Sequence, residues 1–90
     1  MTTYTVSYDL NNQKDYPRLW AELERLGGQR TQNSYWLVSV GNTAKELHDH
    51  LKSFMDGDDA LWVTELTRNH YYSKAKAGTN NWIESHPPAR

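Results

Sequence analysis

Along the first 66 residues, the spacing of apolar residues switches repeatedly between the two-residue period of a strand and the longer period of a helix. This switching limits the folds that the chain can adopt. Tyr4, Val6 and Tyr8 alternate with polar residues, which predicts a strand with one buried face. Between residues 16 and 26 the apolar positions follow a helical stripe instead, and Gly27-Gly28 ends it. The chain therefore begins as a strand followed by an amphipathic helix.

The remaining elements complete an α+β pattern. Residues 29–40 are extended, and a turn or bulge near Gln32-Asn33 predicts a hairpin. Thr43-Ala44-Lys45-Glu46 forms a capping box, so a helix is expected from about Ala44 to Met55. Residues 60–66 predict a last strand. The order is that of a ferredoxin-like βαββαβ sandwich, with two helices on one face of a four-stranded antiparallel sheet.

Such a sheet leaves one face uncovered, and pairing two copies of the chain would hide it, so we expect a homodimer. Ninety residues suffice for a single domain, assigned to residues 1–66, with a basic extension over residues 67–90 that docks on its own domain or on a partner subunit. No apolar run is long enough to cross a membrane, and the first residues lack a secretory signal, which favours the cytoplasm.

Cysteine is absent, which excludes disulfides, thiolate catalysis and cysteine-bound metals. The formal charge of −1 argues against a strong general binder of nucleic acid, but the charge is uneven. Residues 68–90 hold four basic side chains and one acidic one. Arg68, Lys74 and Lys76, interleaved with Tyr71 and Tyr72, would contact phosphates and bases, unless this tail does nothing specific.

Asp9, Arg30 and Ser34 are the candidate catalytic residues. Asp9 follows the first strand, where its carboxylate would bind Mg²⁺ or, alternatively, cap a loop. Arg30 would clamp a phosphate with a hydrogen bond from Ser34, or it protects an edge strand from aggregation.

Aromatic residues offer a second kind of contact. Trp36, Tyr35 and Trp62 would stack on bases if they lie on an exposed sheet face, or they belong to the core or a dimer contact.

One stretch with two histidines and one acidic stretch could be mistaken for metal sites, and both are interpreted as structural instead. His48 and His50 stand two positions apart on a predicted helix, so they point in different directions and do not share a metal. Asp56-Gly57-Asp58-Asp59 lacks the distal glutamate of a calcium loop and is interpreted as a helix stop.

Two short motifs resemble the CRISPR-associated protein two family: Val6-Ser7-Tyr8-Asp9-Leu10 and Arg30-Thr31-Gln32-Asn33-Ser34-Tyr35-Trp36. The resemblance spans residues 3–66 and extends to virulence-associated protein D and, most nearly, to the small SinR-like proteins. It implies a symmetric homodimer in which two copies of Asp9 hold one Mg²⁺ ion. Arg30, Ser34 and the aromatic Trp36 fall in the matching stretch, and only Lys14 and Arg18 remain of the basic run that follows the family's aspartate.

Two functions follow from the residues and the resemblance together. One is a metal-dependent endonuclease acting on RNA or DNA. The other is a non-catalytic scaffold that binds nucleic acid or another protein of a defence or toxin–antitoxin system. The two differ in turnover, because only the endonuclease would lose cleavage when Asp9 is replaced by Asn.

Overall fold

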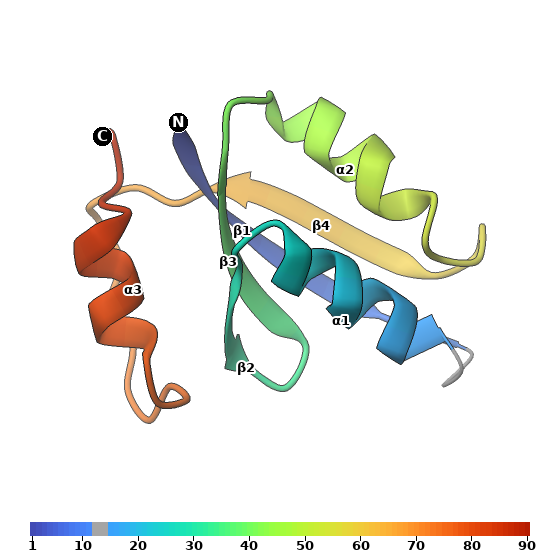
Figure 1. Ribbon diagram of the computed structural model, residues 1–90, viewed down its shortest axis with the longest axis horizontal. Coiled ribbons are helices and arrows are strands. Elements are labelled where there is room, and N and C mark those ends of the chain that lie inside the picture. The colour runs from blue at the N-terminus through green and yellow to red at the C-terminus, as the bar shows by residue number, and fades with distance from the viewer. Residues whose placement is uncertain (12–14) are drawn as a thin grey trace.

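Four strands and three helices make up residues 1–11 and 15–90, the part of the chain that the computed structural model describes (Figure 1). The strands are β1 (Thr2–Asp9), β2 (Gln29–Gln32), β3 (Tyr35–Val40) and β4 (Ala60–Glu65). The helices are α1 (Asp15–Arg25), α2 (Ala44–Lys52) and α3 (Thr79–Ser85). The antiparallel sheet has the order β2-β3-β1-β4, which confirms the predicted ferredoxin-like fold.

Strand β1 lies in the middle of the sheet and connects the two halves of the core. Val6 stands opposite Trp36 of β3 and Val63 of β4, so these three side chains share one face. Helices α1 and α2 cover this face (Figure 1). The buried core comprises Tyr4, Val6, Tyr8, Leu19, Leu23, Trp36, Val38, Val40, Leu47 and Leu51.

Both covering helices end for local reasons. Helix α1 stops before Gly27, whose φ of 77° suits glycine and turns the chain toward β2. Helix α2 begins with the predicted capping box at Thr43 and Glu46 but ends at Lys52, earlier than predicted. Ser53 donates its N–H to His50 O (3.2 Å), so the chain continues in tighter turns as far as Met55.

None of the helices in the described residues is both long enough and apolar enough to cross a membrane.

Residues 67–90 form an extension that returns to the sheet, and it includes α3, a helix that the sequence did not predict. Helix α3 packs beside β2, away from α1 and α2 (Figure 1). Thr3 and Leu37, which face away from α1 and α2, are both buried. The expectation of an uncovered face is therefore wrong for this part of the sheet. Trp62 of β4 does remain 73% exposed.

Candidate functional site

Asp9 ends β1 on the sheet face that points away from α1 and α2. It pairs with Ala60 of β4, and it is exposed. Alternation along β1 places it on the same face as Ser7, because residues two apart on a strand point the same way. Within the described residues, no side chain forms a hydrogen bond or ion pair with the Asp9 carboxylate. As far as the described residues go, its oxygens are therefore open to a ligand from outside the chain.

Arg30 lies on the opposite face of the sheet. Its guanidinium stacks over the Trp20 ring of α1, with Cζ 4.3 Å from the ring centroid. Nε and Nη2 donate to Asn33 O at 3.2 and 2.7 Å. These contacts hold the guanidinium against the β2–β3 turn.

Ser34 lies near Arg30, whereas Asp9 lies apart from both. Arg30 and Ser34 both line a pocket of about 410 Å³, together with Tyr16, Pro17, Trp20 and Asn33. Asp9 is close only through the backbone, since the neighbouring Tyr8 N–H donates to Ser34 O (3.2 Å). The three predicted catalytic residues thus gather at one end of the β1–β3 pair but on two faces.

The Tyr8 hydroxyl organises this end of the sheet, a role that sequence reasoning missed. It accepts hydrogen bonds from the indole Nε1 of Trp20 (2.6 Å) and of Trp36 (3.1 Å), and it donates to Asn33 O (3.4 Å). The alternating pattern identified Tyr8 as buried, but nothing in the pattern indicates which groups its hydroxyl meets. Because Arg30 also bonds to Asn33 O, Tyr8 and Arg30 anchor the same turn.

The structure contradicts a base-stacking role for Trp36. Its side chain is 3% exposed, and its indole lies inside the core, so neither ring face is open to a nucleotide. Trp62 on β4 is the exposed tryptophan of this group, and its Nε1 donates to Thr64 Oγ1 (2.5 Å).

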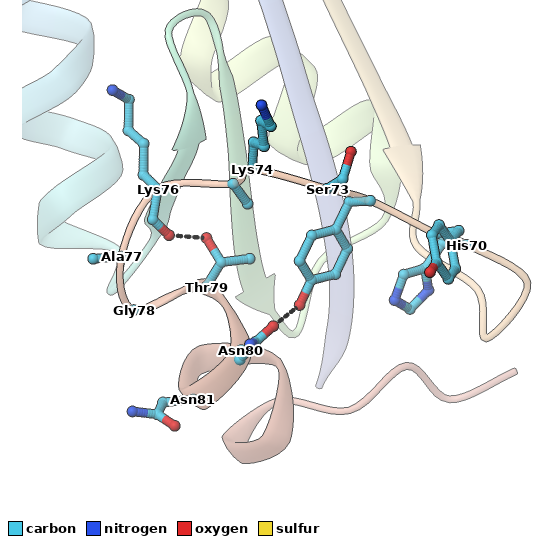
Figure 2. Close-up of a pocket in the computed structure, with 12 residues that line it drawn as sticks. His70, Ser73, Lys74, Lys76, Ala77, Gly78, Thr79, Asn80 and Asn81 are labelled. Atoms are coloured by element: carbon cyan, nitrogen blue, oxygen red, sulfur yellow. Dashed lines mark hydrogen bonds between the residues drawn. The ribbon is translucent and has the colours of Figure 1, made fainter.

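The predicted basic contacts are spread over the chain. Arg18 of α1 donates to Ser53 O (3.3 Å), which ties α1 to the end of α2. Lys14 lies outside the described residues. Lys74 and Lys76 are exposed in the extension and line a pocket of about 640 Å³ formed by residues 70–81 (Figure 2).

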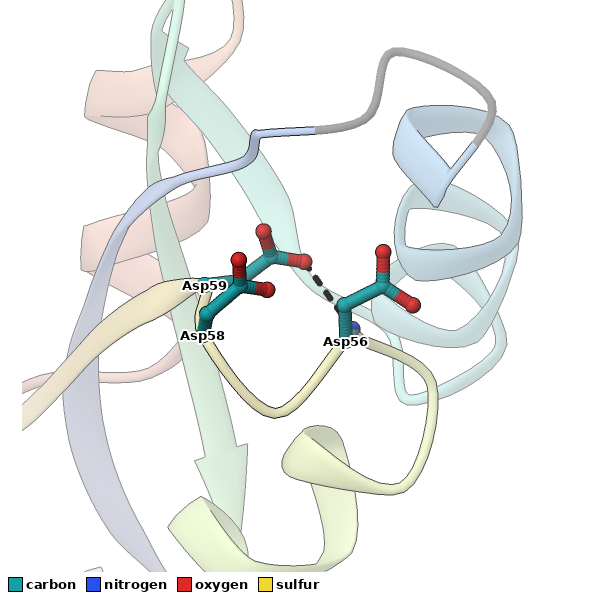
Figure 3. A group of neighbouring side chains, drawn as sticks. All are labelled: Asp56, Asp58 and Asp59. Atoms are coloured by element: carbon teal, nitrogen blue, oxygen red, sulfur yellow. Dashed lines mark hydrogen bonds between the residues drawn. The ribbon is translucent and has the colours of Figure 1, made fainter.

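Three aspartates gather in the loop between α2 and β4 (Figure 3). One oxygen from each of Asp56, Asp58 and Asp59 lies within 4.8 Å of the others, a spacing that could hold a metal ion. Asp59, however, is 4% exposed and both its oxygens are occupied. Oδ1 accepts from Asn11 N (2.7 Å) and Oδ2 from Asp56 N (2.9 Å). These bonds tie the end of β1 to this loop, so Asp59 has a structural role.

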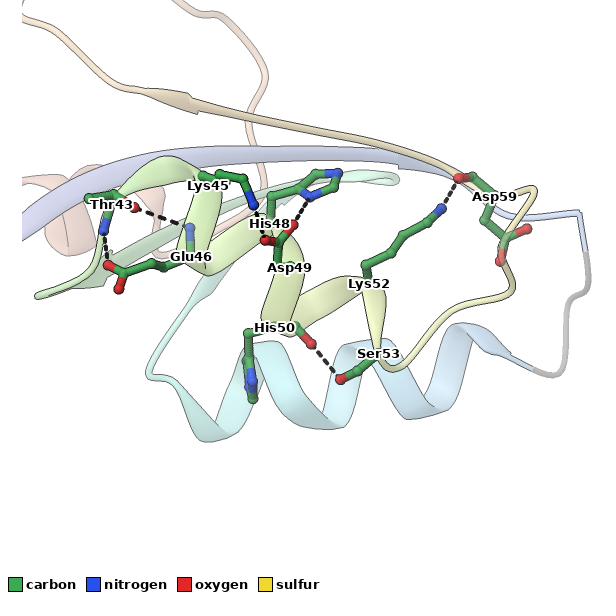
Figure 4. A network of polar contacts seen from close by, with 9 residues as sticks. All are labelled: Thr43, Lys45, Glu46, His48, Asp49, His50, Lys52, Ser53 and Asp59. Carbon is green, nitrogen blue, oxygen red and sulfur yellow. Dashed lines mark hydrogen bonds and ion pairs between the residues drawn. The ribbon is translucent and has the colours of Figure 1, made fainter.

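The two histidines of α2 point in different directions, as the helix geometry predicts (Figure 4). His48 Nδ1 contacts Asp49 (3.0 Å), whereas His50 Nε2 contacts Glu22 of α1 (2.5 Å). Glu22 also pairs with Arg25 (2.5 Å). The hydrogen bonds from Arg25, assisted by His50 and opposed by burial, lower the pKa of the Glu22 carboxyl from 4.5 to about 2. Glu22 is therefore an ionised link between α1 and α2.

Comparison with known proteins agrees with this architecture. The hypothetical protein TT1823 from Thermus thermophilus has a crystal structure that superimposes with a TM-score of 0.67 at 20% sequence identity. The match covers 83% of this chain and 94% of that one, which supports the shared fold. The family described as CRISPR-associated protein Cas2 matches residues 1–74. The chain therefore belongs to the CRISPR-associated protein Cas2 family.

Proposed function

We propose that two copies of this chain pair about a two-fold axis and cleave phosphodiester bonds of RNA or DNA, with one Mg²⁺ ion held by Asp9 of both subunits. The observation that carries the proposal is the exposed Asp9 carboxylate, which has no partner among the described residues and lies on the face away from α1 and α2. Pairing through this face would bring the two carboxylates together.

The donor set suits the ion. Mg²⁺ keeps several waters and is commonly held by one or two carboxylates together with substrate phosphates. One protomer offers Asp9, and the second protomer would offer its equivalent. When bound, such an ion activates water and offsets the charge that develops on the phosphate. Asp9 needs to be exposed for this role, and it is.

Arg30 and Ser34 would position the nucleic acid backbone next to the cleaved bond. A guanidinium has five N–H donors, and the bonds to Asn33 O use two of them, so the others remain for phosphate oxygens. The Ser34 hydroxyl lines the same pocket. Because Arg30 and Asp9 lie on opposite faces of the sheet, we assign Arg30 to a neighbouring phosphate and not to the reacting one.

The test is cleavage of labelled single-stranded RNA and double-stranded DNA with Mg²⁺, with Mn²⁺ and with EDTA. We expect metal-dependent cleavage that Asp9→Asn removes while the dimer, measured by size-exclusion chromatography, persists. Asp58→Asn is the matched control, because Asp58 is also an exposed loop carboxylate. Cleavage that survives Asp9→Asn would overturn the proposal, and loss in Asp58→Asn alone would move the metal to the acidic loop.

A non-catalytic scaffold is the second candidate, favoured by the contacts that Arg30 already makes with Trp20 and Asn33. Such a scaffold would bind nucleic acid or a protein of a defence or toxin–antitoxin system without turnover. Affinity that falls steeply with added salt would indicate nucleic acid, since counterions compete for the phosphates. Within the family, we propose that the small SinR-like proteins are the nearest relatives, because the motifs around Asp9 and Arg30 resemble that group most nearly.

A further inference from the structure

We propose that the loop of residues 70–81 binds single-stranded nucleic acid, with Lys74 and Lys76 on the phosphates and Tyr71 stacked on a base. The loop lines a pocket of about 640 Å³, and in Figure 2 the two lysine side chains leave it toward the same side. The inference rests on the proposed function for the class of ligand only. It requires neither Asp9 nor a metal nor a second subunit.

Positive charge in this part of the chain is not neutralised. No acidic residue occurs between Glu65 and Glu84, whereas Arg68, Lys74 and Lys76 all lie there. Three cations elsewhere in the sequence do have carboxylate partners: Arg25 with Glu22, Lys45 with Asp49 and Arg90 with Glu65. Within the described residues, no carboxylate pairs with the side chain of Arg68, Lys74 or Lys76. When such cations bind the phosphates of a nucleic acid, they release the counterions condensed on it, which favours binding.

The backbone at Lys74 gives a second, independent reason. Lys74 has a φ of 60°, in the left-handed region, and it is the only described residue other than glycine with a positive φ. Glycine or asparagine would adopt this conformation with less strain than lysine. A long cationic side chain at a position that disfavours it points to a use for the charge.

Tyr71 offers a free aromatic surface beside these charges. Its side chain is 97% exposed, although it is a large ring in an otherwise folded loop. The next residue, Tyr72, donates its hydroxyl to Asn80 Oδ1, and its ring lies nearly parallel to His70. Stacking on Tyr71 requires an open base face, which a single strand has and a duplex does not. The loop therefore fits single-stranded nucleic acid.

The backbone of the loop is held in place while these side chains project. Lys76 N–H donates to Thr31 O of β2 (2.9 Å), and Gln29 Nε2 donates to Ala77 O (3.2 Å). Thr79 Oγ1 closes the turn by donating to Lys76 O (2.7 Å). A loop ordered before binding loses less conformational entropy on binding. Because the family match ends at residue 74, this anchor is a feature of this chain beyond the matched segment.

The test is fluorescence anisotropy of the full chain with labelled oligo-dT and oligo-U, in EDTA, over a range of salt concentrations. Neutralising one phosphate contact lowers the slope of log K against log salt by about 0.7 and weakens binding about eightfold near 50 mM salt. We expect this loss from Lys74→Gln and again from Lys76→Gln. Lys45→Gln is the matched control: Lys45 is an exposed lysine on α2, and its replacement should leave binding unchanged.

Tyr71 is tested in the same assay. Tyr71→Ala should weaken binding about fivefold or more, and Tyr71→Phe, which keeps the ring, should retain it. A duplex of the same sequence should bind more weakly than the single strand. The inference is overturned if the two lysine variants bind like wild type, if Lys45→Gln loses as much affinity, or if the duplex binds better.

The outcome is separable from that of the proposed nuclease. Asp9→Asn should bind the oligonucleotides as tightly as wild type, because Asp9 takes no part in the loop. Binding that Lys74→Gln and Lys76→Gln weaken, with no cleavage by wild type or by any variant, would reject the nuclease and support the loop. Cleavage by wild type, together with unaltered affinity in the lysine variants, would support the nuclease and reject the loop as a binding site.

Discussion

On one face of the sheet, α1 and α2 bury leucines such as Leu23 and Leu51 completely, whereas on the other the C-terminal extension makes hydrogen bonds and contributes apolar side chains such as Ile83 that are only partly buried. Thr3 donates to His86 O (2.8 Å), and the indole of Trp82 donates to Gly27 O (2.8 Å). A buried leucine contributes more to the free energy of unfolding than one hydrogen bond that replaces a bond to water. The helix-covered face should therefore dominate stability, while the extension can open locally.

The largest effect is expected from Leu23→Ala in α1. Leu23 is fully buried, so its loss removes apolar contacts and leaves a cavity, destabilising the fold by about 2–5 kcal/mol. Urea unfolding followed by circular dichroism measures this change. Ile83→Ala in the extension is the matched comparison, because Ile83 is only partly buried. Equal losses of unfolding free energy in the two variants would contradict the proposed difference in stability between the two faces.

An effect of intermediate size on the free energy of unfolding is expected when the pH is lowered. The pKa of Glu22 is about 2 in the folded protein and near 4.5 when unfolded, so the ionised carboxylate stabilises the fold above pH 4.5. That stabilisation is lost as the pH falls from about 4.5 to about 2. We expect about 1–2 kcal/mol, less than the full shift allows, because Arg25 and His50 are partly exposed.

Glu22→Gln provides the control for this acid effect. Urea titrations from pH 6 to pH 2.5 should show a shallower loss of stability in the variant than in wild type. If both proteins lose stability in parallel, another carboxylate is responsible and the link between α1 and α2 is weaker than the geometry indicates.

The smallest effect is expected from Trp82→Phe, which removes the indole donor to Gly27 O and keeps an aromatic ring. One such hydrogen bond contributes about 1 kcal/mol. Hydrogen exchange should become faster at the amides of Trp82 and His86 and stay unchanged at Val38 in the core. Faster exchange at Val38 would mean that the extension and the core unfold together, contrary to the comparison above.

Much of the fold could be predicted from the sequence because local periodicity and capping already agree with it. The alternation through Tyr8 specified β1, and the capping box at Thr43 specified the start of α2. The end of α2 was missed by three residues, because nothing in the local sequence distinguishes its last α-helical turn from the tighter turns that follow. Helix α3 was missed because its seven residues are too few to form a stable helix alone.

The candidate site was predicted less well than the fold. Asp9 was correctly expected at the end of a strand, but its separation from Arg30 depends on which sheet face each side chain takes. A turn or bulge near Gln32-Asn33 was expected, and the register is irregular between Arg30 and Gln32, but the sequence did not indicate which sheet face Arg30 takes. Trp36 was expected as a surface aromatic in one interpretation, and the structure places it in the core.

The sequence by itself determined the order of the four strands and of α1 and α2, the absence of cysteine chemistry and the concentration of basic residues after Leu66. Only the tertiary structure decided that Tyr8, Trp20 and Trp36 meet at one hydroxyl, that Asp9 and Arg30 face opposite ways, and that the extension returns to its own sheet. The physical reason is the distance along the sequence over which each interaction acts. Periodicity and capping act between residues a few positions apart, whereas these contacts join residues that only the packed sheet brings together.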